Sequence, residues 1–231
     1  MLAGCTTVGV HTQERAQVDY GPPETLRVCL LVNEGLPPER GMELIAAVNT
    51  EFEPYGVTVV VPWSRPWKRP GFDADAIMEE LITHELEPGC DRLVGLVGRH
   101  AGDFVWGLVL PEVLGAVDVN THTHGFVVAA NGSVNQIIEG PSSATVHEFY
   151  HLLGCPHGLA LTKCYHLIAE IKSKVPLGED LFPGRNAKGE YLFNRAIVNA
   201  YLRAETKLRA EKSQHSAGTQ TPNAAQPPPG R

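Results

Sequence analysis

The sequence predicts an α/β fold with α+β character: a mixed, mostly parallel, twisted sheet of about five strands and a smaller helical part at the C-terminal end. Two observations predict it. The first half alternates short apolar runs with amphipathic helical patterns, which is typical of parallel strands connected through helices. The last third contains long helical patterns instead. With 231 residues, the chain is long enough for a single domain with a substantial core.

Apolar periodicity defines the elements of the first half. Apolar or β-branched runs predict strands at residues 26–32, 57–61 and 93–97. Helical patterns lie between them at residues 39–52 and 73–86. The runs are apolar enough to indicate a sheet buried on both faces.

The second half begins with three runs that have no helical pattern between them, so we expect one of these strands to run antiparallel at the sheet edge; they lie at residues 107–110, 114–119 and 126–130. Helices are expected near residues 143–153, 159–174 and 191–212, with a Pro/Gly-rich loop at 175–189. Ser142 or Ser143 is the expected N-cap of the first of these helices.

The predicted helix at 143–153 carries the pattern H-E-x-x-H-x-x-G-x-x-H. His147 and His151 are four residues apart, so they lie on one face of a helix and can bind one metal ion. Gly154 can adopt the left-handed conformation that ends a helix, which brings His157 back as a third ligand. Glu148 can reach a water on that metal without binding it. The five fixed positions would coincide by chance with a probability on the order of 10⁻⁴.

Three histidine ligands leave the fourth position of a tetrahedral Zn²⁺ open to water, which is typical of catalytic zinc. The sequence therefore predicts hydrolysis of peptide bonds by a zinc-activated water, with Glu148 as the general base. The helix that carries these residues is the predicted active-site helix.

The motif resembles the signature of the metzincin clan of zinc metallopeptidases, and the order of elements over residues 25–170 is also metzincin-like. The resemblance implies a metzincin-like fold, Zn²⁺ as cofactor, and a zinc metalloendopeptidase-like hydrolase with a protein or peptide substrate. It also implies that the edge strand, expected at residues 115–119, borders the cleft and pairs with an extended substrate. An ordinary surface hairpin is the alternative for that segment.

The chain departs from the clan in one respect: all its methionines (Met1, Met42 and Met78) precede the motif, so no methionine turn can follow His157. Residues 163–166 are the candidate replacement, and Tyr165 then resembles the turn tyrosine that some members place near the metal. Two alternatives to a peptidase stay open. One is a non-catalytic zinc-containing binding protein on a metzincin fold, and the other is a zinc hydrolase acting on another amide or ester.

The N-terminal segment bears on localisation. Residues 2–5 resemble a bacterial lipobox, in which Cys5 would carry lipid, and residues 1–24 would then be an anchor and polar tether. We therefore expect a catalytic domain at 25–212 that is extracytoplasmic and lipid-anchored to a bacterial membrane. If the lipobox match is accidental, the protein is cytoplasmic. Residues 213–231 are rich in Ser, Gln, Ala, Thr and Pro, and we expect a disordered tail.

The other cysteines fit the same expectation. An even number permits two disulfides in an oxidising compartment, and a pair between Cys155 and Cys164 would staple the loop that carries His157. Four reduced thiols are the alternative. The cysteines in question are Cys29, Cys90, Cys155 and Cys164.

Charge excludes some partners. The net charge of -7, without a basic cluster, argues against nucleic-acid binding and against docking to anionic lipid. Every apolar run is too short to span a membrane. We expect a monomer. A second histidine pair, His122 and His124, has no third ligand nearby and is expected to be exposed polar sequence.

Overall fold

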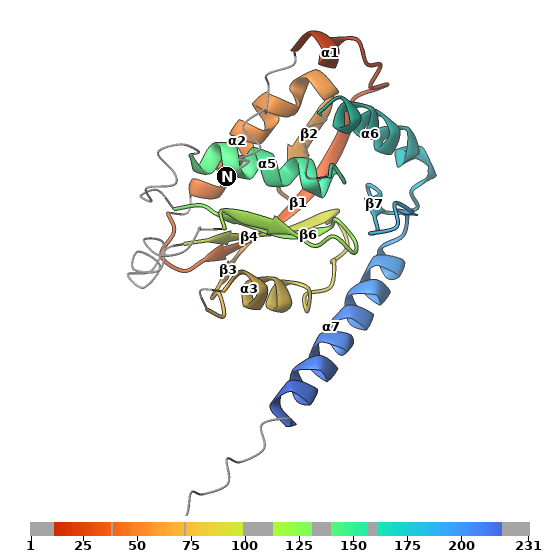
Figure 1. Ribbon diagram of the computed structural model, residues 1–231. Coiled ribbons are helices and arrows are strands. Elements are labelled where there is room, and N and C mark those ends of the chain that lie inside the picture. Colours follow the sequence, from red (N-terminus) through yellow and green to blue (C-terminus); the bar gives the residue numbers. More distant parts are fainter. Residues whose placement is uncertain are drawn as a thin grey trace, which may run out of the picture.

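The computed structural model describes residues 12–37, 39–71, 73–98, 113–130, 140–156 and 161–218. Within these residues the chain forms a six-stranded sheet in the order β2-β1-β4-β6-β5, with β3 also paired to β1, and a separate two-stranded hairpin of β7 and β8. Figure 1 shows α2 and α5 on one face of the sheet and α3 on the other. The predicted fold class, α/β with a mixed and mostly parallel sheet, is confirmed.

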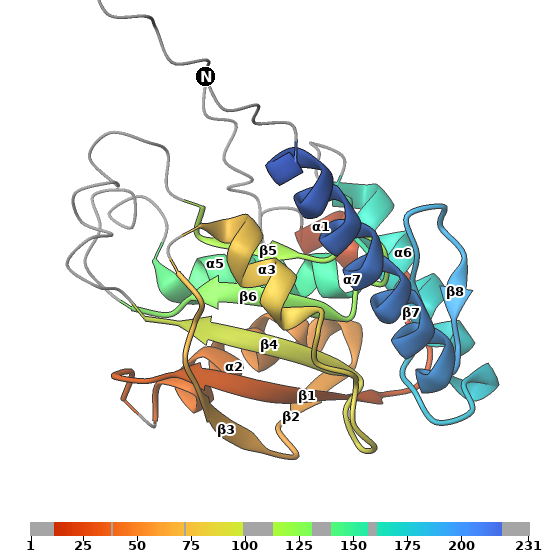
Figure 2. The same cartoon turned by 90° about the horizontal axis from the view of Figure 1, so that it is seen from below.

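The strands are β1 (Glu24–Asn33), β2 (Val57–Val60), β3 (Ser64–Trp67), β4 (Arg92–Val97), β5 (Gly115–Val117), β6 (His124–Val128), β7 (Gly184–Arg185) and β8 (Tyr191–Leu192). The helices are α1 (Thr12–Ala16), α2 (Arg40–Phe52), α3 (Ala74–Leu81), α5 (Pro141–Leu152), α6 (Leu161–Lys174) and α7 (Arg195–Gly218), with short 3-10 turns at Glu53–Tyr55 and Val175–Leu177. Among the described strands of the large sheet, only β5 is antiparallel to its neighbour, as expected for one strand at the sheet edge. Figure 2 shows β1, β4, β6 and β5 side by side, with α3 in front of them.

Strands buried on both faces divide the core into two layers. Along β1, Val28 and Leu30 point into the layer shared with α2, α5 and α6, whereas Cys29 and Leu31 point into the layer shared with α3 and α7. This alternation follows from the two-residue period of a strand. It explains why the central runs read as continuously apolar in the sequence.

Several boundaries differ from the predicted ones. Helix α5 begins at Pro141 with Gly140 as N-cap, not with a serine cap, because proline has no amide hydrogen to satisfy and suits the first helical turn. Helix α3 ends at Leu81 rather than at residue 86. The predicted helix at 191–212 begins only at Arg195, because residues 191–192 form β8, and it continues to Gly218. The predicted strand at 107–110 lies outside the described residues.

The segment before β1 differs from the expected polar tether. It contains α1, whose Arg15 forms an ion pair with Glu51 of α2 at 3.0 Å. Tyr20 is buried, and its ring lies 5.0 Å from that of Tyr55. These contacts attach the segment to the α2 side of the core. Cys5 lies outside the described residues, and among those described no helix is both long and apolar enough to cross a membrane.

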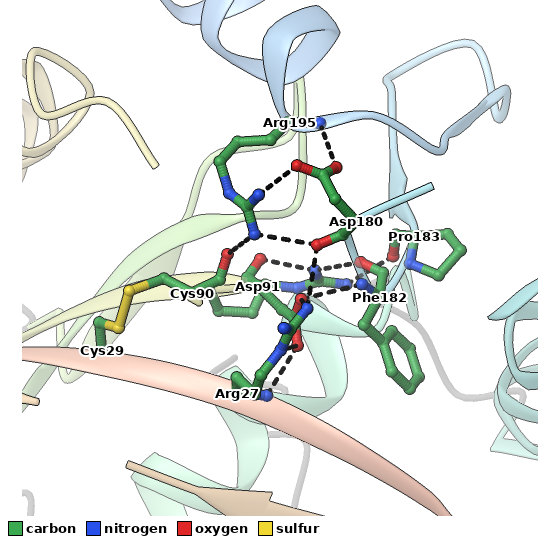
Figure 3. Close-up of polar contacts among 9 residues, drawn as sticks. Arg27, Cys29, Cys90, Asp91, Asp180, Phe182, Pro183 and Arg195 are labelled. Carbon is green, nitrogen blue, oxygen red and sulfur yellow. Dashed lines mark hydrogen bonds and ion pairs between the residues drawn. A yellow bond between two sulfur atoms is a disulfide. The ribbon is translucent and has the colours of Figure 1, made fainter. Parts of the chain in front are cut away.

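A partly buried charge network attaches the C-terminal part to the sheet (Figure 3). Arg27 donates to both carboxylate oxygens of Asp91, at 3.0 and 2.6 Å. Arg195 donates to the carboxylate of Asp180 and to the carbonyl oxygen of Cys90. Because Asp91 is fully buried and also accepts the amide of Phe182, the segment before β7 is fixed against the start of β4.

Candidate functional site

The two histidines of the motif converge on one side of α5. The Nε2 atoms of His147 and His151 lie 3.0 Å apart, and their rings meet nearly at right angles. The opposite side of the helix is fixed in the core by Val146, Phe149 and Leu152, all at most 5% exposed. A helix held in this way keeps both ring nitrogens aimed at the same point.

The turn after α5 sets the orientation of one ring. Gly154 adopts a φ of 86°, the left-handed conformation predicted for it. The carbonyl oxygen of Cys155 then lies 2.6 Å from Nδ1 of His151. A carbonyl can only accept, so Nδ1 carries the proton and Nε2 presents its lone pair towards His147. This is the backbone contact that typically orients a metal-binding histidine.

Glu148 lies between α5 and the edge strand. Its side chain is 6% exposed and covers Gly115 of β5 so closely that a Cβ at that glycine would lie 2.5 Å from Glu148 Cγ. In the described part of the sheet, β5 has β6 on one side and no strand on the other. The antiparallel edge strand predicted at 115–119 is therefore next to the carboxylate of the motif.

The histidine pair fits a zinc ion. Two nitrogens bound at 2.0–2.1 Å to a tetrahedral Zn²⁺ are separated by about 3.3 Å, close to the 3.0 Å between the Nε2 atoms. Neutral imidazole nitrogens are also ligands that zinc prefers. The predicted third ligand, His157, lies outside the described residues, and among the described ones no three His, Cys, Asp or Glu side chains form a metal-binding group.

Two disulfides are present. Cys155 and Cys164 are bonded across a separation of nine residues, which ties the turn that orients His151 to α6. Cys29 and Cys90 are bonded across 61 residues and join β1 to the loop before β4. The first bond is the pair that the sequence suggested. The second bond links Cys29 covalently to Cys90, whereas the alternative was a free thiol in a strand.

Tyr165 lies in the core. Residues 163–166 are part of helix α6 rather than a turn, and Tyr165 is 2% exposed with its ring against that of Tyr55. Burial raises the pKa of its hydroxyl, which also lies in the electrostatic field of Arg15 and Glu51. These neighbours belong to the α1 and α2 side, so we do not include Tyr165 in the catalytic group proposed below.

A pocket of about 310 Å³ opens beside His151. Its lining comes from the end of β5, the turn after α5, and the β7–β8 hairpin: Val117, Val119, His122, His151, Gly154, Cys155, Pro156, Arg185, Asn186 and Ala187. Arg185 and Asn186 were not predicted as site residues. Nothing in their local sequence marks them, because they reach the pocket only through the packing of the hairpin.

The second histidine pair is not exposed as expected. His124 is fully buried at the start of β6, and the carbonyl oxygen of His84 accepts a hydrogen bond from its Nε2 at 2.8 Å. His122 is half-buried in the pocket, with Nδ1 2.6 Å from the carbonyl oxygen of Arg185. Burial lowers the pKa of both rings, to about 4 for His124. His124 therefore has a hydrogen-bonding role in the core and His122 one in the pocket wall, instead of the expected exposed position.

Comparisons with known proteins find likenesses among the solved structures. No protein-family model matches the chain, and no curated protein matches it. Among the solved structures, the chain is similar to the crystal structure of archaemetzincin from Methanopyrus kandleri, with 19% sequence identity and a TM-score of 0.44. The alignment covers 65% of this chain and 96% of that chain. The α/β class of the present protein rests on its own sheet order and strand directions.

Proposed function

We propose that the chain is a zinc-dependent metallopeptidase in which His147, His151 and His157 hold Zn²⁺ and Glu148 is the general base. The observation that carries this proposal is the convergence of two histidine Nε2 atoms at 3.0 Å beside a buried carboxylate. The adjacent edge strand supports a peptide as the substrate, because an extended chain can pair with a free strand edge.

Each residue of the site has its own role in the proposed reaction. The carbonyl oxygen of Cys155 keeps His151 in the tautomer that a metal requires. When bound, zinc polarises the substrate carbonyl and lowers the pKa of its water to about 7. Glu148 accepts a proton from the attacking water and donates it to the leaving amine. The outer edge of β5 aligns the peptide over Glu148, and the buried face of α5 keeps the group rigid.

Metal analysis and a cleavage assay test the proposal together. The full chain is expected to bind about one zinc per molecule, as the three-ligand site predicts. His147→Ala and His151→Ala should lose the metal, whereas Glu148→Ala should keep it and lose about 10²- to 10⁴-fold in the rate of cleavage of a peptide library. His166→Ala is the matched control, since this histidine is exposed on α6.

Each outcome has a distinct meaning. Cleavage by Glu148→Ala at the wild-type rate contradicts the mechanism. Zinc binding without cleavage of any peptide, amide or ester identifies the non-catalytic binding protein instead. Cleavage of amides or esters but of no peptide identifies a zinc hydrolase of another class.

The proposal extends to an extracytoplasmic location. Two disulfides support it, because such bonds persist in oxidising compartments and are rare in the cytosol. Lipid attachment at Cys5 stays a prediction. Thiol alkylation and intact-mass measurement of the protein from its native cells test both points: four free thiols at residues 29, 90, 155 and 164 would contradict the location, and an unmodified Cys5 would contradict the anchor.

A further inference from the structure

The pocket beside His151 has one permanently charged side chain among the described residues that line it, Arg185. None of these described lining residues is an aspartate or a glutamate. Val117, Val119 and Pro156 provide apolar surface around it. With a volume of about 310 Å³, the pocket is at the lower end of the size range of small-ligand sites, roughly 300–1,000 Å³. It therefore suits a single short side chain or chain end, and its charge is positive.

Arg185 is held in place by its backbone. Its amide donates to the carbonyl oxygen of Thr121 at 3.0 Å, and its own carbonyl oxygen accepts a hydrogen bond from Nδ1 of His122 at 2.6 Å. His122 itself adopts a φ of 53°, which is uncommon for a residue with a side chain. Such conformations persist only where surrounding contacts enforce them, and they cluster at functional sites.

The side chain of Arg185 is held as well. A Cβ added at Gly154, the glycine of the motif, would lie 3.2 Å from Arg185 Cδ, so the stem of the arginine crosses close over the turn that follows α5. The Nε atom donates to the carbonyl oxygen of Gly189 at 3.3 Å. Restraint at both ends lowers the entropy lost when a ligand binds the guanidinium.

Among the described residues, no carboxylate pairs with the charge of Arg185. In the described part of the chain it forms no ion pair with a carboxylate, in contrast to Arg27 with Asp91 at 2.6 Å. Its two Nη atoms make no hydrogen bond to a described residue and are not buried. A preorganised planar fork of this kind matches a carboxylate, which it can bind through two parallel hydrogen bonds.

From these observations we propose that Arg185 forms a carboxylate-binding subsite next to the metal site. The preferred substrates then carry a carboxylate beside the scissile bond, either as an acidic side chain or as the free C-terminus. The inference rests on the proposed peptidase function for the word substrate, whereas the binding of a carboxylate to the pocket can be measured without any cleavage.

Two measurements test the subsite on the full chain. The first is the rate of cleavage of peptide pairs that differ only as Glu or Gln on either side of the scissile bond, and of Gln peptides ending there in a carboxylate or an amide. The second is calorimetric titration of the same peptides into Glu148→Ala protein, with and without zinc. We expect a preference of about tenfold or more for the carboxylate member, the value of a charge-assisted hydrogen bond.

Three variants link this preference to Arg185. Arg185→Gln should abolish the preference, Arg185→Lys should retain part of it because the charge stays and the fork is lost, and Arg185→Glu should favour a Lys peptide over its Gln partner. Arg203→Gln is the matched control, because this arginine is exposed on α7 and paired with Glu85 at 2.6 Å. Circular dichroism checks that each variant is folded.

The outcomes separate this inference from the proposed function. A wild-type protein that shows no preference in either measurement, or a preference that survives Arg185→Gln, overturns the subsite. A preference in the calorimetric titration together with no cleavage of any peptide supports the subsite and contradicts the peptidase. The Glu pairs and the terminal-carboxylate pairs distinguish the two sources of the carboxylate.

Discussion

Two regions that meet at the C-terminal end of α5 bury polar groups in opposite ways. The fully buried Arg92 extends the charge network next to Asp91 and donates to four carbonyl oxygens, those of Asp91, Leu152, Phe182 and Pro183, at 2.7 to 2.9 Å. At the candidate site, the polar atoms of His147 and His151 are aimed at each other, and those of Arg185 face an open pocket. Both regions hold polar side chains in fixed positions, but only the second leaves binding capacity for a ligand.

The network nevertheless supports the site. Arg92 lies under the last turn of α5, where its positive charge complements the negative end of the helix dipole. Through Phe182 and Pro183 it also fixes the segment that leads into Arg185. Burial lowers the pKa of Arg92 to about 10, which leaves it charged at neutral pH. One residue thus sets the distance between the motif helix and the hairpin.

The largest expected effect is a loss of folding stability when Arg92 is replaced. Arg92→Met should lower the free energy of unfolding by about 3–5 kcal/mol, because it leaves buried carbonyl groups without donors. Urea unfolding measures it, and Arg203→Gln, in an exposed pair, should change it little. A loss below about 1 kcal/mol would show that Arg92 is no more important than an ordinary surface charge.

Removal of either disulfide should lower the stability of the protein, but the two removals should differ in their effect on metal binding. The chain-entropy model predicts a loss of about 4 kcal/mol for the double variant Cys29→Ala/Cys90→Ala and about 3 kcal/mol for Cys155→Ala/Cys164→Ala, because the first closes the longer loop. Only the second should weaken zinc binding, by about 10- to 100-fold, since it releases the carbonyl group that orients His151.

Urea unfolding and competition with a zinc-binding dye measure the two effects on the same samples. The variant that removes the Cys29–Cys90 bond is the control for a general loss of rigidity. An equal loss of zinc affinity in both double variants would contradict the orienting role of Cys155.

Regular elements were predictable where local pattern and burial agree. The strands β1 and β4 are apolar on both faces and were found within a few residues of their ends. The strand β3 was missed because its sequence, Ser-Arg-Pro-Trp, has neither alternation nor a continuous apolar run. It pairs with the second half of β1 at the sheet edge, a position where proline is tolerated.

The site was predictable only where chemistry is encoded in spacing. His147 and His151 are one helical turn apart, so the sequence alone could place their rings together. The contacts of Arg185 with Thr121, His122 and Gly154 join residues 31 to 64 positions away in the chain, and no local rule encodes such contacts. The charged subsite therefore had to come from the packed structure.

The buried His124 extends the comparison, because it makes the stability of the protein depend on pH. Both ring nitrogens of His124 have hydrogen-bonding partners within the protein, as the polar groups of the charge network have. Its Nε2 donates to the carbonyl oxygen of His84, and its Nδ1 lies 3.0 Å from the hydroxyl of Thr123. Burial lowers its pKa from 6.5 to about 4, so the unfolded chain binds this proton more readily than the folded one. The contribution of the neutral His124 ring to the free energy of unfolding is complete above pH 6.5 and is lost as the pH falls towards 4.

This loss should reach at most about 3 kcal/mol between pH 7 and pH 4, at 1.36 kcal/mol for each unit of pKa difference. Urea unfolding over this range measures it. The variant His124→Asn should show a shallower decline than wild type, because it has no group that titrates there. Parallel declines for the two proteins would mean that another group causes the acid sensitivity.

The smallest and most specific effect concerns Gly115, where the edge strand touches the candidate base. Gly115→Ala places a Cβ 2.5 Å from Glu148 Cγ and 2.9 Å from its Oε1, so the carboxylate must move. A displacement of this size should lower kcat by about tenfold to a hundredfold, which corresponds to about 1.4–2.7 kcal/mol in the barrier. Zinc content should stay at the wild-type level, because no atom of His147 or His151 is among those nearest to this added Cβ.

Gly140→Ala is the matched control, since a Cβ there meets nothing within 4 Å. If both variants cleave at the wild-type rate, Glu148 can act from a displaced position, and the close approach of β5 is a matter of packing alone.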